Sequence, residues 1–161
     1  MNNLHRELAP VTDAAWDQIE EEASRTFTRH VAGRRVVDVS DLQGPQLSAI
    51  GDGHLRDIDP PTPDVFARAR TATPVIEWRV PFTVTREAVD DVERGSQDSD
   101  WQPVKDAART CAFAEDMAVI DGYAAAGITG LRDGSSHPPL PLPADARDYP
   151  TAVSQALTRL R

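Results

Sequence analysis

Cysteine, long apolar runs and positive charge are all scarce in this chain of 161 residues. The single cysteine, Cys111, excludes an internal disulfide framework. Cys111 falls on the apolar face of a predicted helix, so we expect it to be a small core residue. No run of about 18 apolar residues is present, so the sequence predicts no transmembrane helix. The N-terminus also lacks an apolar signal core, so we expect a cytoplasmic location.

Acidic residues outnumber basic residues by 26 to 17, which gives a formal net charge of −9. A nucleic-acid partner requires a basic stripe on the protein, so this balance argues against one. The length is that of one domain and is sufficient to bury a core.

Catalytic motifs are missing as well. The four histidines, His5, His30, His54 and His137, lie on separate segments without the spacing of metal ligands. Carboxylates occur in runs such as 20–22 and 115–116, whose adjacent side chains point apart on a helix and predict solvated faces. No phosphate-binding loop and no nucleophile elbow is found. We therefore expect no catalytic residue and no metal.

An amphipathic helix is predicted from Asp13 to about Val31. Its apolar residues recur at spacings of three or four, which places them on one face: Trp16, Ile19, Ala23, Phe27 and Val31. Thr12 is suited to cap its start, and Gly33 follows its last turn as a stop. The β-branched residues after that stop, Val36, Val37 and Val39, predict a strand.

Turn signals dominate the next segment, from Ser40 to Thr73. Between them, residues 47–50 and 54–58 are predicted to form the short strands of a protruding hairpin. Residues 75–85 alternate as a strand does, with apolar side chains on one face. The segment 86–94 reads as a short acidic helix with Val89 and Val92 directed inward.

Two helices are predicted in the last third of the chain. Asp100 caps a long helix that tolerates Pro103 in its first turn and carries an apolar stripe from Val104 to Val119. Asp148 caps a final helix that runs to the last residue, with its apolar side chains on one face: Val153, Ala156, Leu157 and Leu160.

Several short motifs occur in a fixed order along nearly the whole chain. They are Asn3-Leu4, Ala9-Pro10-Val11-Thr12, Trp16, Phe27, Gly33-Arg34-Arg35-Val36-Val37-Asp38-Val39, Val80-Pro81-Phe82-Thr83, Asp90-Asp91-Val92-Glu93-Arg94-Gly95, Asp98-Ser99-Asp100-Trp101, Phe113 with Glu115-Asp116, Gly122-Tyr123 and Ser154-Gln155-Ala156-Leu157. In order and spacing they resemble the N-terminal part of the encapsulins of the linocin or peroxidase-encapsulating type, which are bacterial nanocompartment shell proteins.

The resemblance implies an α+β fold like that of tailed-phage major capsid proteins, the Hong-Kong-97-type fold. Residues 1–39 would form an N-terminal arm, helix and first strand, and residues 40–74 an extended loop. Residues 75–130 would form a peripheral domain with a long spine helix, and residues 131–161 the start of a truncated axial domain. The chain resembles roughly the first three-fifths of a family member, so we expect a truncation or fragment.

The function implied by the resemblance is structural. The chain would be a subunit of an icosahedral, homo-oligomeric shell in the bacterial cytoplasm. The shell would enclose a dye-decolourising peroxidase or a ferritin-like protein, bound through the cargo's C-terminal targeting peptide. Some family members bind flavin through an aromatic residue at the position that Glu87 occupies here, so we expect no cofactor.

The cargo peptide would dock beside the N-terminal helix, on an apolar trough with a few charges that set its register. The residues expected to form this site are Phe27, Val31, Arg34, Val36 and Asp38.

Two alternatives stay open. One is a phage or prophage major capsid protein, which shares the fold, although the chain has no basic N-terminal region. The other is a secreted bacteriocin or protease, a role attributed to some relatives, although no catalytic constellation supports it.

Overall fold

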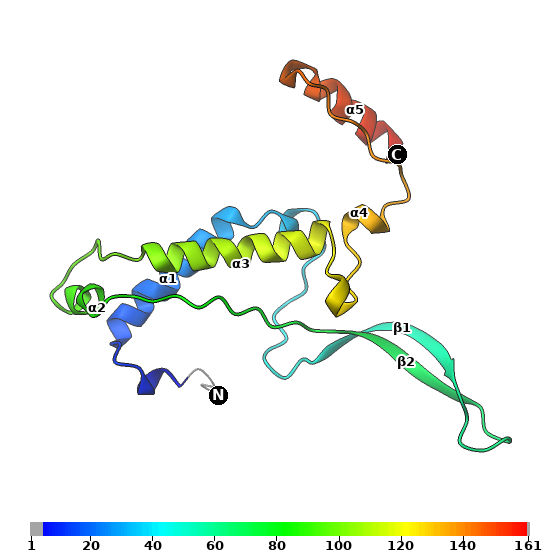
Figure 1. The fold of residues 1–161 in the computed structure, drawn as a ribbon, viewed down its shortest axis with the longest axis horizontal. Helices are drawn as coiled ribbons and strands as arrows, with labels where there is room; N and C mark the ends of the chain where they lie inside the picture. Colours follow the sequence, from blue (N-terminus) through cyan, green and yellow to red (C-terminus); the bar gives the residue numbers. More distant parts are fainter. Residues whose placement is uncertain (1–4, 161) are drawn as a thin grey trace.

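Two long helices lie side by side in the computed structural model, which describes residues 5–160 (Figure 1). Helix α1 spans Asp13–His30 and helix α3 spans Gln102–Ile120. They run in the same direction, because Trp101 contacts Gln18 at their starts and Asp116 contacts Ala32 near their ends. The shorter helix α2, Arg86–Glu93, packs against α1. These three helices form the helical body of the molecule.

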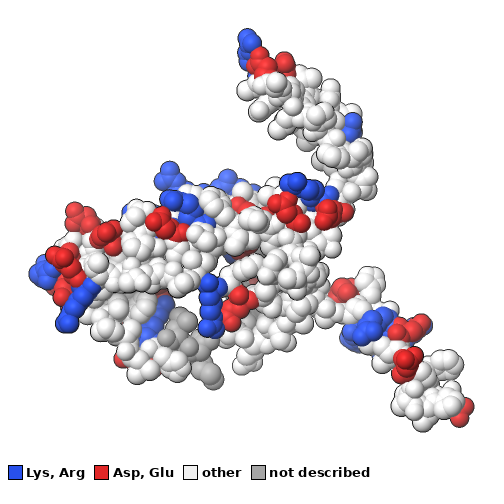
Figure 2. Space-filling model, viewed as in Figure 1, with Lys and Arg blue, Asp and Glu red and all other residues white. Residues whose placement is uncertain are grey.

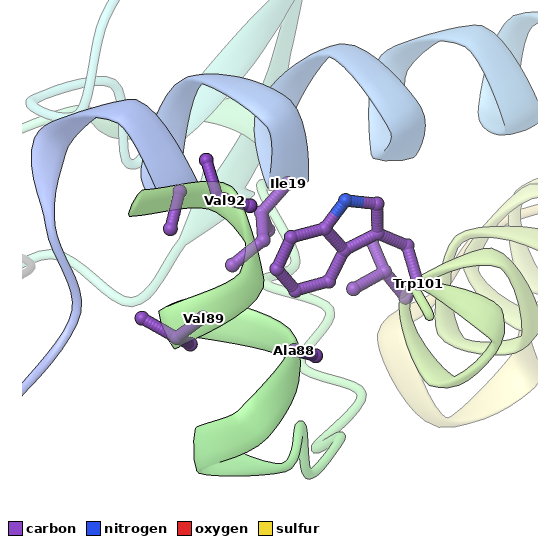
Figure 3. Close-up of a cluster of buried hydrophobic side chains, with 7 residues drawn as sticks. Ile19, Ala88, Val89, Val92 and Trp101 are labelled. Carbon is purple, nitrogen blue, oxygen red and sulfur yellow. The ribbon is translucent and has the colours of Figure 1, made fainter. Parts of the chain in front are cut away.

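The core of the helical body lies where the three helices meet (Figure 3). Its buried side chains are Ala15, Ile19, Ala88, Val89, Val92, Trp101 and Val104. The indole Nε1 of Trp101 donates a hydrogen bond of 3.0 Å to Oε1 of Gln18, which satisfies the polar edge of a buried ring. The inward placement of Val89 and Val92 confirms that prediction.

The starts of the two long helices lie close to the predicted residues. The Thr12 hydroxyl caps α1 by accepting a hydrogen bond from the Ala15 amide at 3.3 Å, as predicted. The N-cap residue of α3 is Trp101 and not the predicted Asp100, although the Asp100 carboxylate accepts a hydrogen bond from the Gln102 amide at 3.0 Å. Pro103 lies in the first turn of α3, where its missing N–H is harmless. Cys111 is half-buried beside the buried Ala112, so it lies at the margin of the packed face.

A two-stranded antiparallel hairpin projects from the body (Figure 1). Strand β1 spans Ala49–Ile58 and pairs with β2, Ala67–Pro74. The predicted hairpin is confirmed, but its predicted strands are wrong, because residues 49–50 and 54–58 belong to one strand. The glycines that suggested a turn, Gly51 and Gly53, instead accommodate an irregularity in the register, and Gly53 has a φ of +80°.

Two other predicted strands are also wrong. The segment after α1 turns as the 3-10 helix η2, Gly33–Arg35, and residues 36–39 join no sheet. Residues 75–85 are extended but pair with no strand within residues 5–160. β-branched residues and an alternating apolar pattern favour strands. A strand also needs a neighbouring strand to complete its backbone hydrogen bonds.

Short helices connect the remaining segments. They are η1 (Arg6–Leu8), η3 (Ala124–Ala126), α4 (Leu131–Gly134) and η4 (Ala146–Asp148). Helix α5, Tyr149–Arg159, follows η4 and projects from the body (Figure 1). The predicted final helix is thus confirmed, although Asp148 makes no side-chain capping bond. Its apolar residues are exposed: Val153 by 54%, Leu157 by 56% and Leu160 by 73%.

Most of the predicted N-terminal arm is described, and residues 1–4 lie outside the described residues. The observed mixture of helices with a small sheet is an α+β architecture.

Candidate functional site

The candidate site is the turn from α1 into η2, which lies against α3. The carboxylate of Asp116 accepts hydrogen bonds from the backbone amides of Ala32, at 2.9 and 3.0 Å, and of Gly33, at 2.6 Å. Hydrogen bonds to an ionised acceptor are stronger than neutral ones, and a negative charge is favoured at the start of a helix. Asp116 therefore holds the turn in place from a helix more than 80 residues away in the chain.

Gly33 is favoured at this turn because the backbone approaches α3 closely. A Cβ atom at this position would lie 3.1 Å from Oδ1 of Asp116 and 3.2 Å from Cβ of Val119. The sequence predicts Gly33 as a stop for α1, but α1 ends at His30 and its C-cap residue is Val31. The close approach to α3, and not a left-handed backbone, explains the glycine.

Arg34 is oriented by two contacts. Its guanidinium donates two hydrogen bonds to the Glu115 carboxylate, from Nε at 2.5 Å and from Nη2 at 2.8 Å. Its Cζ atom also lies 4.9 Å from the centre of the Phe27 ring. The hydrogen bonds from Arg34 to Glu115 raise the pKa of the guanidinium above its ordinary value. Because the side chain is half-exposed, these contacts orient Arg34 more than they stabilise the fold.

The other predicted site residues occupy different environments. Val31 is 7% exposed and belongs to the packed interior, whereas Phe27 is half-buried beneath Arg34. Val36 is 65% exposed. Asp38 is exposed and makes no side-chain hydrogen bond or ion pair with the part of the chain that the structure describes. The fold thus brings Phe27 and Arg34 into contact and leaves Val36 and Asp38 open to solvent.

An apolar groove of about 860 Å³ lies beside Glu115. It is lined mainly by apolar side chains, which include Val37, Ile76, Trp78, Val119, Ile128 and Leu131. Trp78 also packs against Tyr123, with a ring-centre distance of 5.5 Å. The groove therefore lies between the extended segment 75–85, the last turns of α3, the chain that follows α3, and Val37.

Sequence reasoning missed the part that Glu115 and Asp116 play. The pattern predicts a solvated acidic face, but both carboxylates hold the turn after α1. Their place in the last turns of an apolar-striped helix was the available signal, since such a helix packs against a neighbour.

Two negative observations accompany the site. Within residues 5–160, no three His, Cys, Asp or Glu side chains come together as a metal site would require. Over the same residues, no helix is both long enough and apolar enough to cross a membrane.

Comparison of the sequence with known families identifies the class of protein. A family model described as encapsulating protein for peroxidase matches residues 1–161. The chain belongs to this family, the encapsulins, which confirms the resemblance found in the sequence.

Its relatives define the type more narrowly. A type 1 encapsulin shell protein of Rhodococcus erythropolis is 64% identical over 161 residues, which are 100% of this chain and 61% of the relative. The type 1 encapsulin shell proteins of Mycobacterium tuberculosis and Brevibacterium linens are 57% and 54% identical over all of this chain, and 61% and 60% of their own lengths are covered. The chain spans about three-fifths of the length of these relatives.

Proposed function

We propose that the chain acts as a structural subunit of an encapsulin shell in the bacterial cytoplasm and not as an enzyme. The observation that carries this proposal is its large exposed surface. The chain exposes 13132 Å². A compact monomer of 17.6 kDa is expected to expose about 7,900 Å². An excess of this size is typical of a subunit whose surfaces are covered by neighbours.

The excess surface is concentrated in the projecting parts. All ten residues of β1 are exposed, and Phe66 at the end of the hairpin is fully exposed. Large apolar side chains that are exposed close together are typical of a protein interface. In the proposed shell, the hairpin reaches a neighbouring copy of the chain.

The proposal also assigns the chain a specific fold within the α+β class. A long helix, a projecting hairpin and a terminal helix outside the body support the tailed-phage capsid-like fold. The division into residues 1–39, 40–74, 75–130 and 131–161 is part of this proposal.

Cargo docking is proposed at the turn after α1. The family description names a peroxidase as the encapsulated protein, and a peroxidase or ferritin-like enzyme is the proposed cargo here. A short C-terminal peptide of the cargo would lie over Phe27 and Val36 and along the apolar groove. Arg34 and Asp38 would fix its register, and the buried Val31 would support Phe27 from beneath. This docking site is supported by the fixed orientation of Arg34. Because its side chain is already held by Glu115, little conformational freedom is lost when a peptide binds.

The test is the R34A/D38A double variant, co-expressed with the peroxidase. If both side chains contact the cargo peptide, the affinity for the peroxidase should fall by roughly thirtyfold and less of it should co-purify, because each of the two interface contacts contributes on the order of 1 kcal/mol. Particle size, measured by mass photometry, should not change.

The matched control is R86A/D90A, which removes an exposed ion pair of 3.6 Å on α2 and also leaves the net charge unchanged. Its cargo loading should equal that of the parent chain. Full loading in R34A/D38A would refute the docking site. If the 161 residues are a fragment, mass photometry should show small species for them and shells for the longer form, and failure of the longer form to give any large particle would refute the shell role.

A further inference from the structure

A second site lies further toward the start of α1. Four cationic side chains line one pocket of about 520 Å³ between α1 and α3. They are Arg25, Arg29, Lys105 and Arg109. We call it the basic pocket. It is unexpected in a chain whose net charge is −9. Figure 2 shows blue side chains along the upper edge of the helical body, where these two helices lie side by side.

Helix geometry brings the four cations together. Arg25 and Arg29 are four residues apart on α1, and Lys105 and Arg109 are four residues apart on α3, so each pair lies on one face of its helix. Because the two helices run in the same direction, the two pairs face the same pocket along their shared length.

The one carboxylate that lines the pocket is already engaged. Glu22 is 8% exposed and accepts hydrogen bonds from the Thr26 hydroxyl, at 2.9 Å, and from Arg25. Burial raises the pKa of Glu22, but these hydrogen bonds and the charge of Lys105 outweigh it and lower the pKa overall. Glu22 is therefore ionised at neutral pH and offsets Arg25.

The other cations are only partly offset. Arg109 lies 3.3 Å from Asp106 and donates a hydrogen bond of 3.4 Å to Nε2 of His30. Neither Arg29 nor Lys105 has an ion-pair partner among residues 5–160. The basic pocket thus retains about two uncompensated positive charges, and their mutual repulsion would be relieved by a bound anion.

We propose that the basic pocket binds a small phosphate-bearing anion. A guanidinium offers paired N–H donors that match phosphate oxygens, and a lysine adds a compact point charge. The volume lies in the range of small-molecule sites, roughly 300 to 1,000 Å³, which favours a small ligand over an acidic protein segment. The site is independent of the proposed docking turn, because the two share no residue.

Pyrophosphate is the probe, titrated into the purified chain by calorimetry at low ionic strength. The parent chain should bind it saturably, and added salt should weaken binding because the pocket is partly exposed. The R29A/K105A double variant should bind at least about tenfold more weakly, because each hydrogen bond to a charged group contributes on the order of 1.5 kcal/mol or more.

The matched control is R56A/R70A on the hairpin, which lowers the net charge by the same two units. Its affinity for pyrophosphate should stay within about twofold of the parent. Circular dichroism checks folding, and R29Q/K105Q, which keeps more of each aliphatic stem, replaces the alanine pair if helicity falls. Equal weakening in both double variants, the absence of saturable binding in the parent, or tighter binding of a tetraglutamate peptide than of pyrophosphate would each overturn the proposal.

Discussion

The helical body and the projecting hairpin are stabilised in different ways. In the body, Val104 is 1% exposed and Trp101 is 6% exposed, so packing between helices far apart in sequence holds the structure. In the hairpin, every residue of β1 is exposed and Phe66 is fully exposed. An isolated two-stranded hairpin is marginally stable in water. The body is therefore stabilised by contacts within the chain, whereas the hairpin needs contacts from outside it.

The largest expected effect is that of Trp101→Ala. It removes a buried indole and leaves the carbonyl of Gln18 without its donor, which should lower the free energy of unfolding by about 3–5 kcal/mol. Urea unfolding followed by circular dichroism measures this change. Trp78→Ala is the control, because Trp78 is 40% exposed on the extended segment and should matter less. A loss of equal size in both variants would contradict the contrast between packed and open regions.

A smaller effect is expected for Gly33→Val. The added side chain would crowd Asp116 and Val119, so the free energy of unfolding should fall by about 1–3 kcal/mol. Gly51→Val on the hairpin is the matched change, since no atom lies within 4 Å of a Cβ placed there. That variant should keep the stability of the parent or gain slightly, because valine favours strands. If Gly51→Val lowered the free energy of unfolding more than Gly33→Val, the turn after α1 would be loosely packed.

Acid should weaken the body through Glu22. The pKa of Glu22 is lowered in the folded chain, so its stabilisation is complete above the ordinary glutamate pKa of about 4.3 and is lost as the pH falls through the lower folded value. Thermal unfolding from pH 6 down to about pH 3 should therefore show a smaller loss of Tm for Glu22→Gln than for the parent. Asp57→Asn on the exposed hairpin should leave the slope unchanged, and identical slopes for E22Q and the parent would exclude this role of Glu22.

The smallest expected effect on subunit stability is that of Phe66→Ser. Because Phe66 is fully exposed, the free energy of unfolding should change by less than about 0.5 kcal/mol. The same substitution should reduce assembly, because it removes an apolar contact proposed to reach a neighbouring copy. Mass photometry of the variant and the parent at equal concentration measures this, and unchanged particle size would assign the hairpin tip a role other than assembly.

The fold was predictable where its signals are local. The spacing of Trp16 and Ile19 and the capping residue Thr12 correctly predicted α1, because a helix is made of contacts between residues three or four apart. The strand predicted at 36–39 failed because a strand needs a neighbour to complete its backbone hydrogen bonds, and these residues join no sheet.

The candidate site was predictable only in part. The motif around Gly33 pointed to Arg34 and Asp38, yet nothing near them in sequence indicates that Glu115 orients Arg34 and that Asp38 remains open. The basic pocket was invisible for the same reason, since Arg29 and Lys105 are 76 positions apart by their numbers.

By itself, the sequence determined the three helices of the body, the acidic balance and the family, because periodicity, capping and motif order are properties of neighbouring residues. Only the tertiary structure decided which charges are paired, which apolar residues are buried and where the chain must turn. Those outcomes depend on partners brought together by packing, and their energies come from desolvation and contact between distant segments.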